Sequence, residues 1–193
     1  MDLPSEYTEE EIFAFLKKRQ HTLEGVAISG GEPTLQPDLA AFIRKIRSAY
    51  GLKIKLDSNG CRPDVLAALM EEGLLDYIAM DIKSGPSGYA RCCGRQELDL
   101  KPYRESIRLL LSGGIPYEFR TTVVRGLHSE ADFQELGPLI EGAERYYLQS
   151  YQDSGNVLDR EAGFAAFSRE ELLRFRDIVA PYVKQAELRG VEY

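Results

Sequence analysis

The sequence predicts an α/β fold built on a parallel sheet, and three observations support this expectation. Short apolar runs of strand length alternate with helical patterns along all 193 residues, without a linker or a low-complexity tract. Capping residues stand where helices should begin. Polar residues recur where successive strands should end. We therefore expect one domain spanning residues 1–193.

Five apolar runs have the length and the residue types of buried strands. They are Gly25–Ser29, Leu52–Leu56, Tyr77–Ile82, Tyr117–Val124 and Tyr146–Ser150. Because helical patterns separate them, the connections should be right-handed crossovers between parallel strands. Periodicity leaves two architectures open, namely an open doubly wound sheet and a barrel.

The helices are predicted from apolar stripes and capping boxes. One stripe comprises Leu39, Phe42, Ile43 and Ile46, and a second comprises Tyr103, Ile107, Leu110 and Leu111. Two capping boxes pair a hydroxyl with a carboxylate three residues later: Thr8 with Glu11, and Ser168 with Glu171. The second box begins a C-terminal helix and tail over residues 164–193, in which Glu187–Val191 is a candidate edge strand.

Composition argues against several classes of function. The net charge of −7 gives no broad attraction to nucleic acid or to an anionic membrane, so we expect neither as a partner. No apolar run is long enough to span a bilayer, and the first ten residues do not resemble a signal peptide, so we expect a cytoplasmic protein. The three cysteines, Cys61, Cys92 and Cys93, should be reduced thiols, and His21 and His128 should be surface residues.

Chemistry should lie beyond the carboxyl ends of the strands, where parallel sheets bind their ligands. The first predicted strand leads into Gly30, Gly31 and Glu32, followed by Pro33. Two glycines allow a ligand to approach bare backbone, although a tight strand-to-helix connection would explain them equally well.

The next two predicted strands also end in polar residues, Asp57-Ser58-Asn59-Gly60 and Met80-Asp81-Ile82-Lys83. Asp81 and Lys83 lie two residues apart and should face the same side of a strand. There they would share a zwitterionic ligand or form a buried ion pair that closes the mouth of a barrel.

Gly-Gly-Glu-Pro at residues 30–33 resembles the S-adenosylmethionine (SAM) binding motif of radical SAM enzymes. The order and spacing of Leu56–Gly60, Ala79–Lys83 and Phe119–Val124 narrow the resemblance to the activating proteins of anaerobic ribonucleoside-triphosphate reductase, with the pyruvate formate-lyase activating enzymes as near relatives. The likeness covers roughly residues 8–155. It implies a partial (β/α)6 TIM-like barrel of parallel strands.

The resemblance implies a role for each matching residue. Gly30, Gly31 and Glu32 would hold the methionine amino group, Lys83 its carboxylate, and Arg120 would reach toward SAM unless it pairs with Glu118 instead. The SAM-binding set is completed by Ser58, Asn59 and Gln152, and a monovalent-cation site would be formed by Asp57, Ser58, the Met80 carbonyl and Asp81. Gln152 lies in Leu148–Gly155, where the formate-lyase activating enzymes have a histidine, and this difference favours the reductase branch.

The family's CxxxCxxC motif, which binds a [4Fe–4S] cluster, is absent, and neither Cys61 nor the adjacent Cys92 and Cys93 has its spacing. We expect that the chain begins after the cluster loop, that the first strand and helix of the barrel are missing, and that the chain alone is inactive.

For the full-length protein, the resemblance implies reductive cleavage of SAM to a 5′-deoxyadenosyl radical. This radical would generate a glycyl radical on a partner such as anaerobic ribonucleotide reductase, with flavodoxin or ferredoxin as the electron donor. The alternative is a non-catalytic module that binds SAM or a nucleotide.

Overall fold

The computed structural model describes residues 7–152 and 163–191. Its strands are β1 (Gly25–Ile28), β2 (Lys53–Ser58), β3 (Tyr77–Asp81), β4 (Tyr117–Val123), β5 (Tyr146–Ser150) and β6 (Ala186–Arg189). They form one sheet in the order β1-β2-β3-β4-β5-β6, and each neighbouring pair is parallel. The parallel α/β fold predicted from the sequence is confirmed.

The helices connect the strands in chain order. They are α1 (Glu9–Arg19), the 3-10 helix η1 (Pro33–Leu35), α2 (Leu39–Tyr50), α3 (Pro63–Glu71), α4 (Tyr89–Cys92), α5 (Lys101–Leu111), α6 (Glu130–Leu139), α7 (Arg169–Val179) and the 3-10 helix η3 (Ala180–Tyr182). The capping boxes at Thr8 and Ser168 are both present, and Ser129 with Asp132 forms a third at α6. Within the described residues, no helix has the length and apolar character needed to cross a bilayer.

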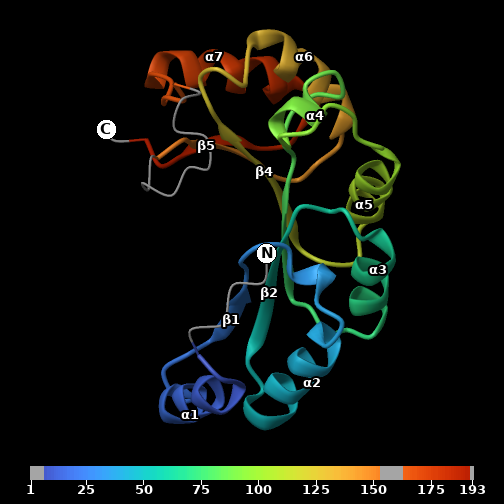
Figure 1. The fold of residues 1–193 in the computed structure, drawn as a ribbon, viewed down its shortest axis with the longest axis vertical. Coiled ribbons are helices and arrows are strands. Elements are labelled where there is room, and N and C mark those ends of the chain that lie inside the picture. Colours follow the sequence, from blue (N-terminus) through green and yellow to red (C-terminus); the bar gives the residue numbers. More distant parts are fainter. Residues whose placement is uncertain (1–6, 153–162, 192–193) are drawn as a thin grey trace.

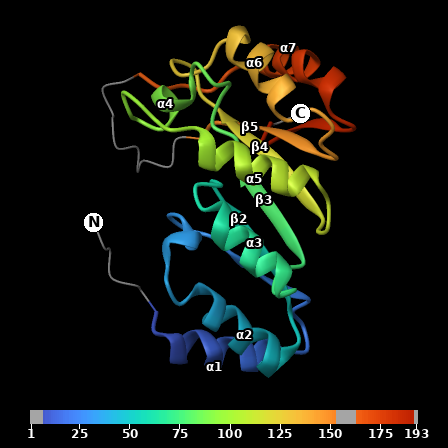
Figure 2. The ribbon, with the colours of Figure 1, turned by 90° about the vertical axis from the view of Figure 1, so that its right-hand side faces the viewer.

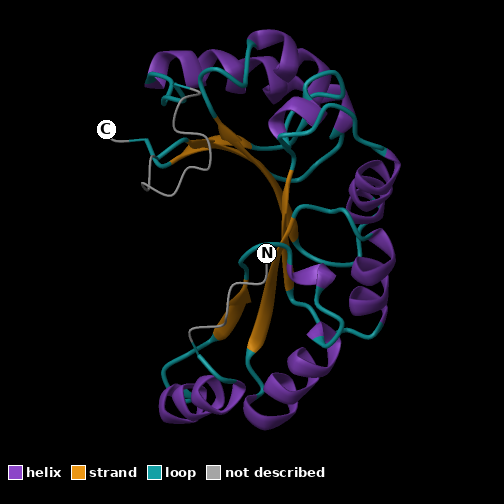
Figure 3. Ribbon diagram, in the orientation of Figure 1, coloured by secondary structure: helices purple, strands orange, loops and turns teal. Residues whose placement is uncertain are grey.

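The sheet curves into an open arc, with the helices along its convex side (Figures 1 and 3). Sequential strand order produces this shape, because every crossover then places its helix on the same face. The structure therefore resolves the choice left open by periodicity in favour of a partial barrel. The tail supplies the predicted edge strand as β6, which pairs with β5.

The core lies between the convex face of the sheet and the helices. Strand residues such as Ile54, Leu56, Ile78 and Phe119 are fully buried there, against the predicted helix stripes. Alternation along each strand sends the neighbouring side chains to the concave face, so Lys55, Asp57, Asp81, Glu118 and Arg120 all line the inside of the arc. This face is consequently rich in charge.

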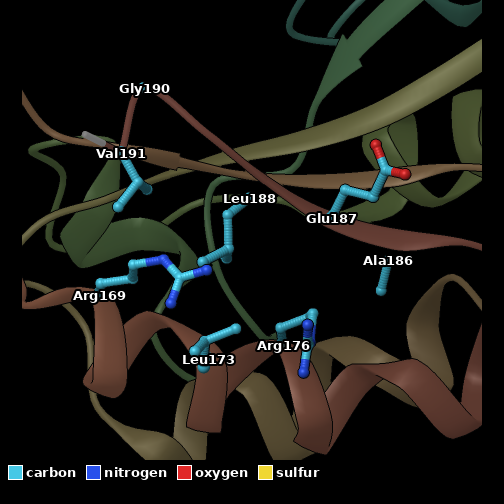
Figure 4. A pocket seen from close by; sticks show the side chains of 8 residues that line it. All are labelled: Arg169, Leu173, Arg176, Ala186, Glu187, Leu188, Gly190 and Val191. Carbon is cyan, nitrogen blue, oxygen red and sulfur yellow. The ribbon is translucent and has the colours of Figure 1, made fainter. Parts of the chain in front are cut away.

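The carboxyl ends of the strands gather along one edge of the arc, where α4 also lies (Figure 2). A separate groove of about 410 Å³ runs between α7 and the edge strand β6 (Figure 4). Its lining comprises Arg169, Leu173, Arg176, Ala186, Glu187, Leu188, Gly190 and Val191. None of the residues predicted to bind SAM lines this groove.

Candidate functional site at the carboxyl ends of the strands

The carboxylate of Glu32 connects the ends of β1 and β2. One oxygen accepts hydrogen bonds from the Thr34 amide at 3.1 Å, from the Thr34 hydroxyl at 2.6 Å and from the Ser58 hydroxyl at 2.9 Å. The other oxygen accepts the Asn59 amide at 2.6 Å. Glu32 thus holds the predicted motifs of two strands together, a role that the sequence did not reveal.

Gly30 and Gly31 form an exposed turn before Glu32. Both have left-handed backbone conformations, with φ of 98° and 51°, which glycine adopts without steric cost. A Cβ added at either position would have no neighbouring atom within 4 Å apart from the adjoining residues. The turn therefore presents open backbone at the predicted methionine-binding position.

The Ser58-Asn59-Gly60 segment is closely packed. Its Ser58 hydroxyl accepts the Gly60 amide at 3.0 Å, and the Asn59 side-chain carbonyl accepts the Cys61 amide at 2.9 Å. The Ser106 hydroxyl donates to the Gly60 carbonyl at 2.7 Å, and a Cβ at Gly60 would lie 2.0 Å from the Met80 methyl carbon. The second strand end is therefore rigidly placed.

A chain of alternating charges crosses β2, β3 and β4 on the concave face. Asp57 binds Lys55 at 2.5 Å and the Arg120 guanidinium at 3.2 Å, each through a different oxygen. Asp81 binds Arg120 at 2.5 Å and Lys83 at 2.8 Å in the same manner. Three cations and two carboxylates leave one net positive charge, which suits an anionic group such as a ligand carboxylate.

Burial and charge act in opposition on Asp81. Burial by itself would raise the pKa of its carboxyl, but Lys83 and Arg120 outweigh burial and hold the pKa below its usual value. The pKa of the Arg120 guanidinium is raised because the two carboxylates outweigh its own desolvation. Both groups are therefore ionised at neutral pH.

The residues of the predicted cation site are largely engaged by other groups. All four carboxylate oxygens of Asp57 and Asp81 contact Lys or Arg side chains. The Ser58 hydroxyl donates a hydrogen bond to Glu32. Among the described residues, no cluster of three or more His, Cys, Asp or Glu side chains is suited to a metal ion. The monovalent-cation site stays a prediction.

The alternative pairing of Arg120 with Glu118 is wrong. Glu118 instead forms a two-pronged contact with Arg189 of β6, at 2.6 and 2.8 Å, and accepts the Tyr77 hydroxyl at 2.9 Å. Both Glu118 and Arg120 face the concave side, but each finds its partners on other strands, up to two positions away in the sheet, rather than on its own. Spacing within one strand does not reveal such partners.

His128 also departs from expectation, because it is only 9% exposed rather than a surface residue. Its ring lies between the ends of β3 and β4, where it contacts the Lys83 carbonyl at 2.8 Å and the Val124 amide at 3.1 Å. His21 is exposed, as predicted. The polar loop around His128 gave no sign that its ring folds inward.

Gln152 is the predicted SAM-binding residue that lies apart from these contacts. It is exposed, and its side-chain amide lies beside Gly190, near the edge strand. The remainder of the segment that suggested its role, residues 153–155, lies outside the described residues.

The groups present fit SAM but not an iron–sulfur cluster. Exposed glycine backbone and the half-exposed Lys83 ammonium are suited to the amino and carboxylate ends of methionine. A cluster needs several thiolates around one site, but Cys61, Cys92 and Cys93 belong to no group of three or more His, Cys, Asp or Glu side chains, among the described residues, that could hold a metal ion. These three thiols therefore do not form a cluster site.

Two relatives share moderate sequence identity with the chain. One is a protein of Methanocaldococcus jannaschii provisionally named as a glycyl-radical enzyme activating enzyme, 27% identical over 172 residues, which cover 87% of this chain and 71% of the relative. Another, from Thermococcus kodakarensis and provisionally named as a GTP 3′,8-cyclase, is 27% identical over 145 residues, 73% of this chain and 44% of the relative.

Solved structures share the fold. A domain of the pyruvate-formate lyase-activating enzyme from Bacteroides vulgatus superposes with a TM-score of 0.68 at 20% identity, covering 86% of this chain and 99% of that one. SuiB of Streptococcus suis bound to its precursor peptide SuiA gives a TM-score of 0.70 at 13% identity, covering 96% of this chain and 43% of SuiB. Residues 1–136 match the sequence profile of the radical SAM superfamily, so the chain belongs to that superfamily.

Proposed function

We propose that the chain is the SAM-binding part of a radical SAM activating enzyme whose substrate is a glycyl radical enzyme. The observation that carries this proposal is the placement of two complementary groups at the carboxyl ends of strands of one parallel sheet, one after β1 and the other at β3 and β4. The turn at Gly30 and Gly31 is anchored by Glu32, and the cationic pair Lys83 and Arg120 is held by Asp81. Together they match the zwitterionic end of SAM.

Each part of this site has a distinct task in binding. Backbone groups of Gly30 and Gly31, with Glu32, would receive the methionine amino group. Lys83 would bind the methionine carboxylate, exchanging part of its contact with Asp81 for the ligand. Arg120 is 16% exposed and already bonded to two carboxylates. It would therefore keep its position when SAM binds and would hold Asp57 and Asp81 in place. These contacts would fix the direction of the sulfonium.

The reaction proposed for the full-length protein is reductive cleavage of SAM, followed by hydrogen abstraction from a glycine of the partner protein. An iron–sulfur cluster supplies the electron in this class of enzyme. Since Cys61, Cys92 and Cys93 do not form its site, we propose that other cysteines supply the ligands and that this chain by itself does not cleave SAM. Anaerobic ribonucleotide reductase is the proposed partner, flavodoxin or ferredoxin the proposed donor, and the cytoplasm the proposed compartment.

The binding step can be tested without iron. We expect calorimetry to detect SAM binding to the chain, and Lys83→Met to raise the Kd about 10- to 100-fold, because it removes a charge-assisted contact. Lys101→Met on α5 is the matched control and should leave the Kd unchanged, because this side chain is 77% exposed. Absence of SAM binding to the wild-type chain would refute the proposed site.

A second experiment separates the activating enzyme from a non-catalytic SAM-binding module. The arrangement of the three thiols favours a non-catalytic module for the isolated chain. The present chain should therefore be compared, after anaerobic iron–sulfur reconstitution, with a version that is extended upstream. We expect a version extended upstream with cluster-binding cysteines to form 5′-deoxyadenosine under dithionite, and the present chain to form none. If the extended version binds SAM and holds iron but cleaves nothing, the binding module is the correct description.

A further inference from the structure

The backbone that carries Lys83 leaves the sheet immediately after β3. The last bond along the sheet runs from the Ile82 amide to the Arg120 carbonyl, at 2.8 Å. Beyond it, the Ile82 carbonyl accepts the Thr121 hydroxyl at 2.7 Å, and Thr121 in turn accepts the buried Tyr146 hydroxyl at 2.8 Å. Side chains, rather than a neighbouring strand, therefore hold the segment from which Lys83 projects.

His128 makes the next attachment. Its Nε2 lies 2.8 Å from the Lys83 carbonyl oxygen, which can only accept, so Nε2 must carry the proton. Its Nδ1 lies 3.1 Å from the Val124 amide, which can only donate. Nδ1 also lies 3.3 Å from the Val124 carbonyl oxygen. The neutral Nε2–H form makes the two shorter contacts at once, and the ring joins the end of β4 to the backbone of Lys83.

Asp132 completes the attachment one residue further along. Its Oδ1 accepts the hydroxyl of Ser84 at 2.7 Å and the Arg91 guanidinium at 2.9 Å. Its Oδ2 accepts both the amide and the hydroxyl of Ser129, each at 2.8 Å, which caps α6. Ser84 is fully buried, so this bond is shielded from water. Residues 82, 83 and 84 are thus each held by a different side chain.

We propose that His128 is a positioning residue of the SAM site, one that holds Lys83 through its main-chain carbonyl. The inference rests on the proposed SAM-binding role of Lys83. His128 touches neither the ammonium of Lys83 nor the expected ligand position. It acts by fixing where the lysine side chain begins, so that its ammonium reaches both Asp81 and the methionine carboxylate.

Of the three attachments, the one made by His128 is the most directly linked to Lys83. Thr121 holds the preceding residue and Asp132 the following one, whereas His128 bonds to the carbonyl of Lys83 itself. The Cys92 thiol lies 3.7 Å from Nε2, on the α4 side. Movement of the ring would therefore shift the main chain of Lys83, and with it the start of the lysine side chain. No residue that is proposed to contact SAM would be removed.

Two substitutions separate the contribution of the Nε2 contact from that of the Nδ1 contact. His128→Gln places an amide donor near the position of Nε2 and preserves the bond to the Lys83 carbonyl. His128→Asn is too short to reach Lys83 but can still accept the Val124 amide at the position of Nδ1. A purely structural ring would be replaced equally well by either variant, or better by Asn, which keeps the local loop closed.

The experiment measures the Kd for SAM by calorimetry in the wild type, both variants and His21→Gln, with thermal unfolding as the check on folding. We expect His128→Asn to weaken binding about tenfold and His128→Gln to stay within about threefold of the wild type. His21→Gln is the matched control and should not change the Kd, because His21 is exposed and lies before β1, outside the proposed site.

The outcomes distinguish the two proposals. If the wild type binds SAM and the two His128 variants bind equally well, the positioning role is wrong and the proposed function stands. If the wild type binds no SAM, both fail together. Should His128→Asn prove unfolded, nitrogen chemical shifts of the wild-type ring decide the matter, because an unprotonated Nε2 in the folded protein would overturn the bond to Lys83.

Discussion

Asp81 is the shared counterion of Lys83 and Arg120, the two cations of the proposed SAM site on the concave face. Its side chain is 29% exposed and lies directly opposite Arg120 on the neighbouring strand. Neutralising it would leave two positive side chains close together without their shared counterion. Its effect on the free energy of unfolding should therefore depend on pH.

We expect Asp81→Asn to lower the free energy of unfolding by about 1–3 kcal/mol at pH 7, because it leaves the charges of Arg120 and Lys83 poorly compensated. The folded-state pKa of Asp81 lies below its usual value. Its contribution should therefore be complete above about pH 4 and disappear as the pH falls through the lowered pKa. Urea denaturation of both proteins at pH 7, 5 and 3 measures this difference.

The control for this experiment is Asp177→Asn, an exposed carboxyl in contact with Arg176, which should have little effect at any of the three pH values. A difference between wild type and Asp81→Asn that is as large at pH 3 as at pH 7 would contradict the charge network.

At the scale of the elements, the turns after β1 and β2 differ in how tightly they are packed. Gly31 and Gly60 both have positive φ, at 51° and 78°. Gly31 faces open space, whereas Gly60 packs against Met80 and Ser106. The first turn is therefore open to contact by a ligand, while the second packs against buried side chains and holds the end of β2 in place.

Alanine at the two glycines should show this contrast. We expect Gly31→Ala to destabilise the protein by about 1 kcal/mol, the cost of a left-handed conformation alone. Gly60→Ala should cost about 2–4 kcal/mol, because the new methyl group also collides with the buried Met80 side chain. Chemical denaturation checks both values, and equal costs would mean that the interior around Met80 adapts without strain.

At the scale of the whole molecule, the arc is held together by contacts that skip a strand. Arg189 of β6 bonds to Glu118 of β4 and lies 3.3 Å from the ring centroid of Tyr147 on the intervening β5. Burial by itself would raise the pKa of Glu118, but Arg189 and Tyr77 outweigh it and lower the pKa. This cluster fastens the edge strand beside the groove of Figure 4.

Glu118→Gln should loosen that edge selectively. The substitution keeps the shape of the side chain but removes the charge that binds the Arg189 guanidinium in two places. We expect faster hydrogen exchange of the β6 amides and unchanged exchange in β2, measured by mass spectrometry under native conditions. Uniformly faster exchange across all strands would instead indicate global destabilisation and contradict a local fastening role.

Local chemistry determined much of this protein from its sequence. The strands, the stripes of α2 and α5, and the caps at Thr8 and Ser168 depend on residues a few positions apart, and the structure confirms them. The Gly-Gly-Glu-Pro motif likewise identified the superfamily, because its glycines are adjacent in sequence. Such features can be recognised without knowledge of which strands become neighbours.

Only the tertiary structure decided which side chains become hydrogen-bond or ion-pair partners. Glu32 bonds to residues of β2 and the turn after it, Arg120 chooses Asp57 and Asp81 over Glu118, and His128 turns inward to Lys83. Each partner lies 26 to 63 residues away. The curvature of the sheet, which follows from sequential strand order, brings them together. Hydrogen bonds and ion pairs depend on distances of a few ångströms, and periodicity along one chain segment carries no information about such distances.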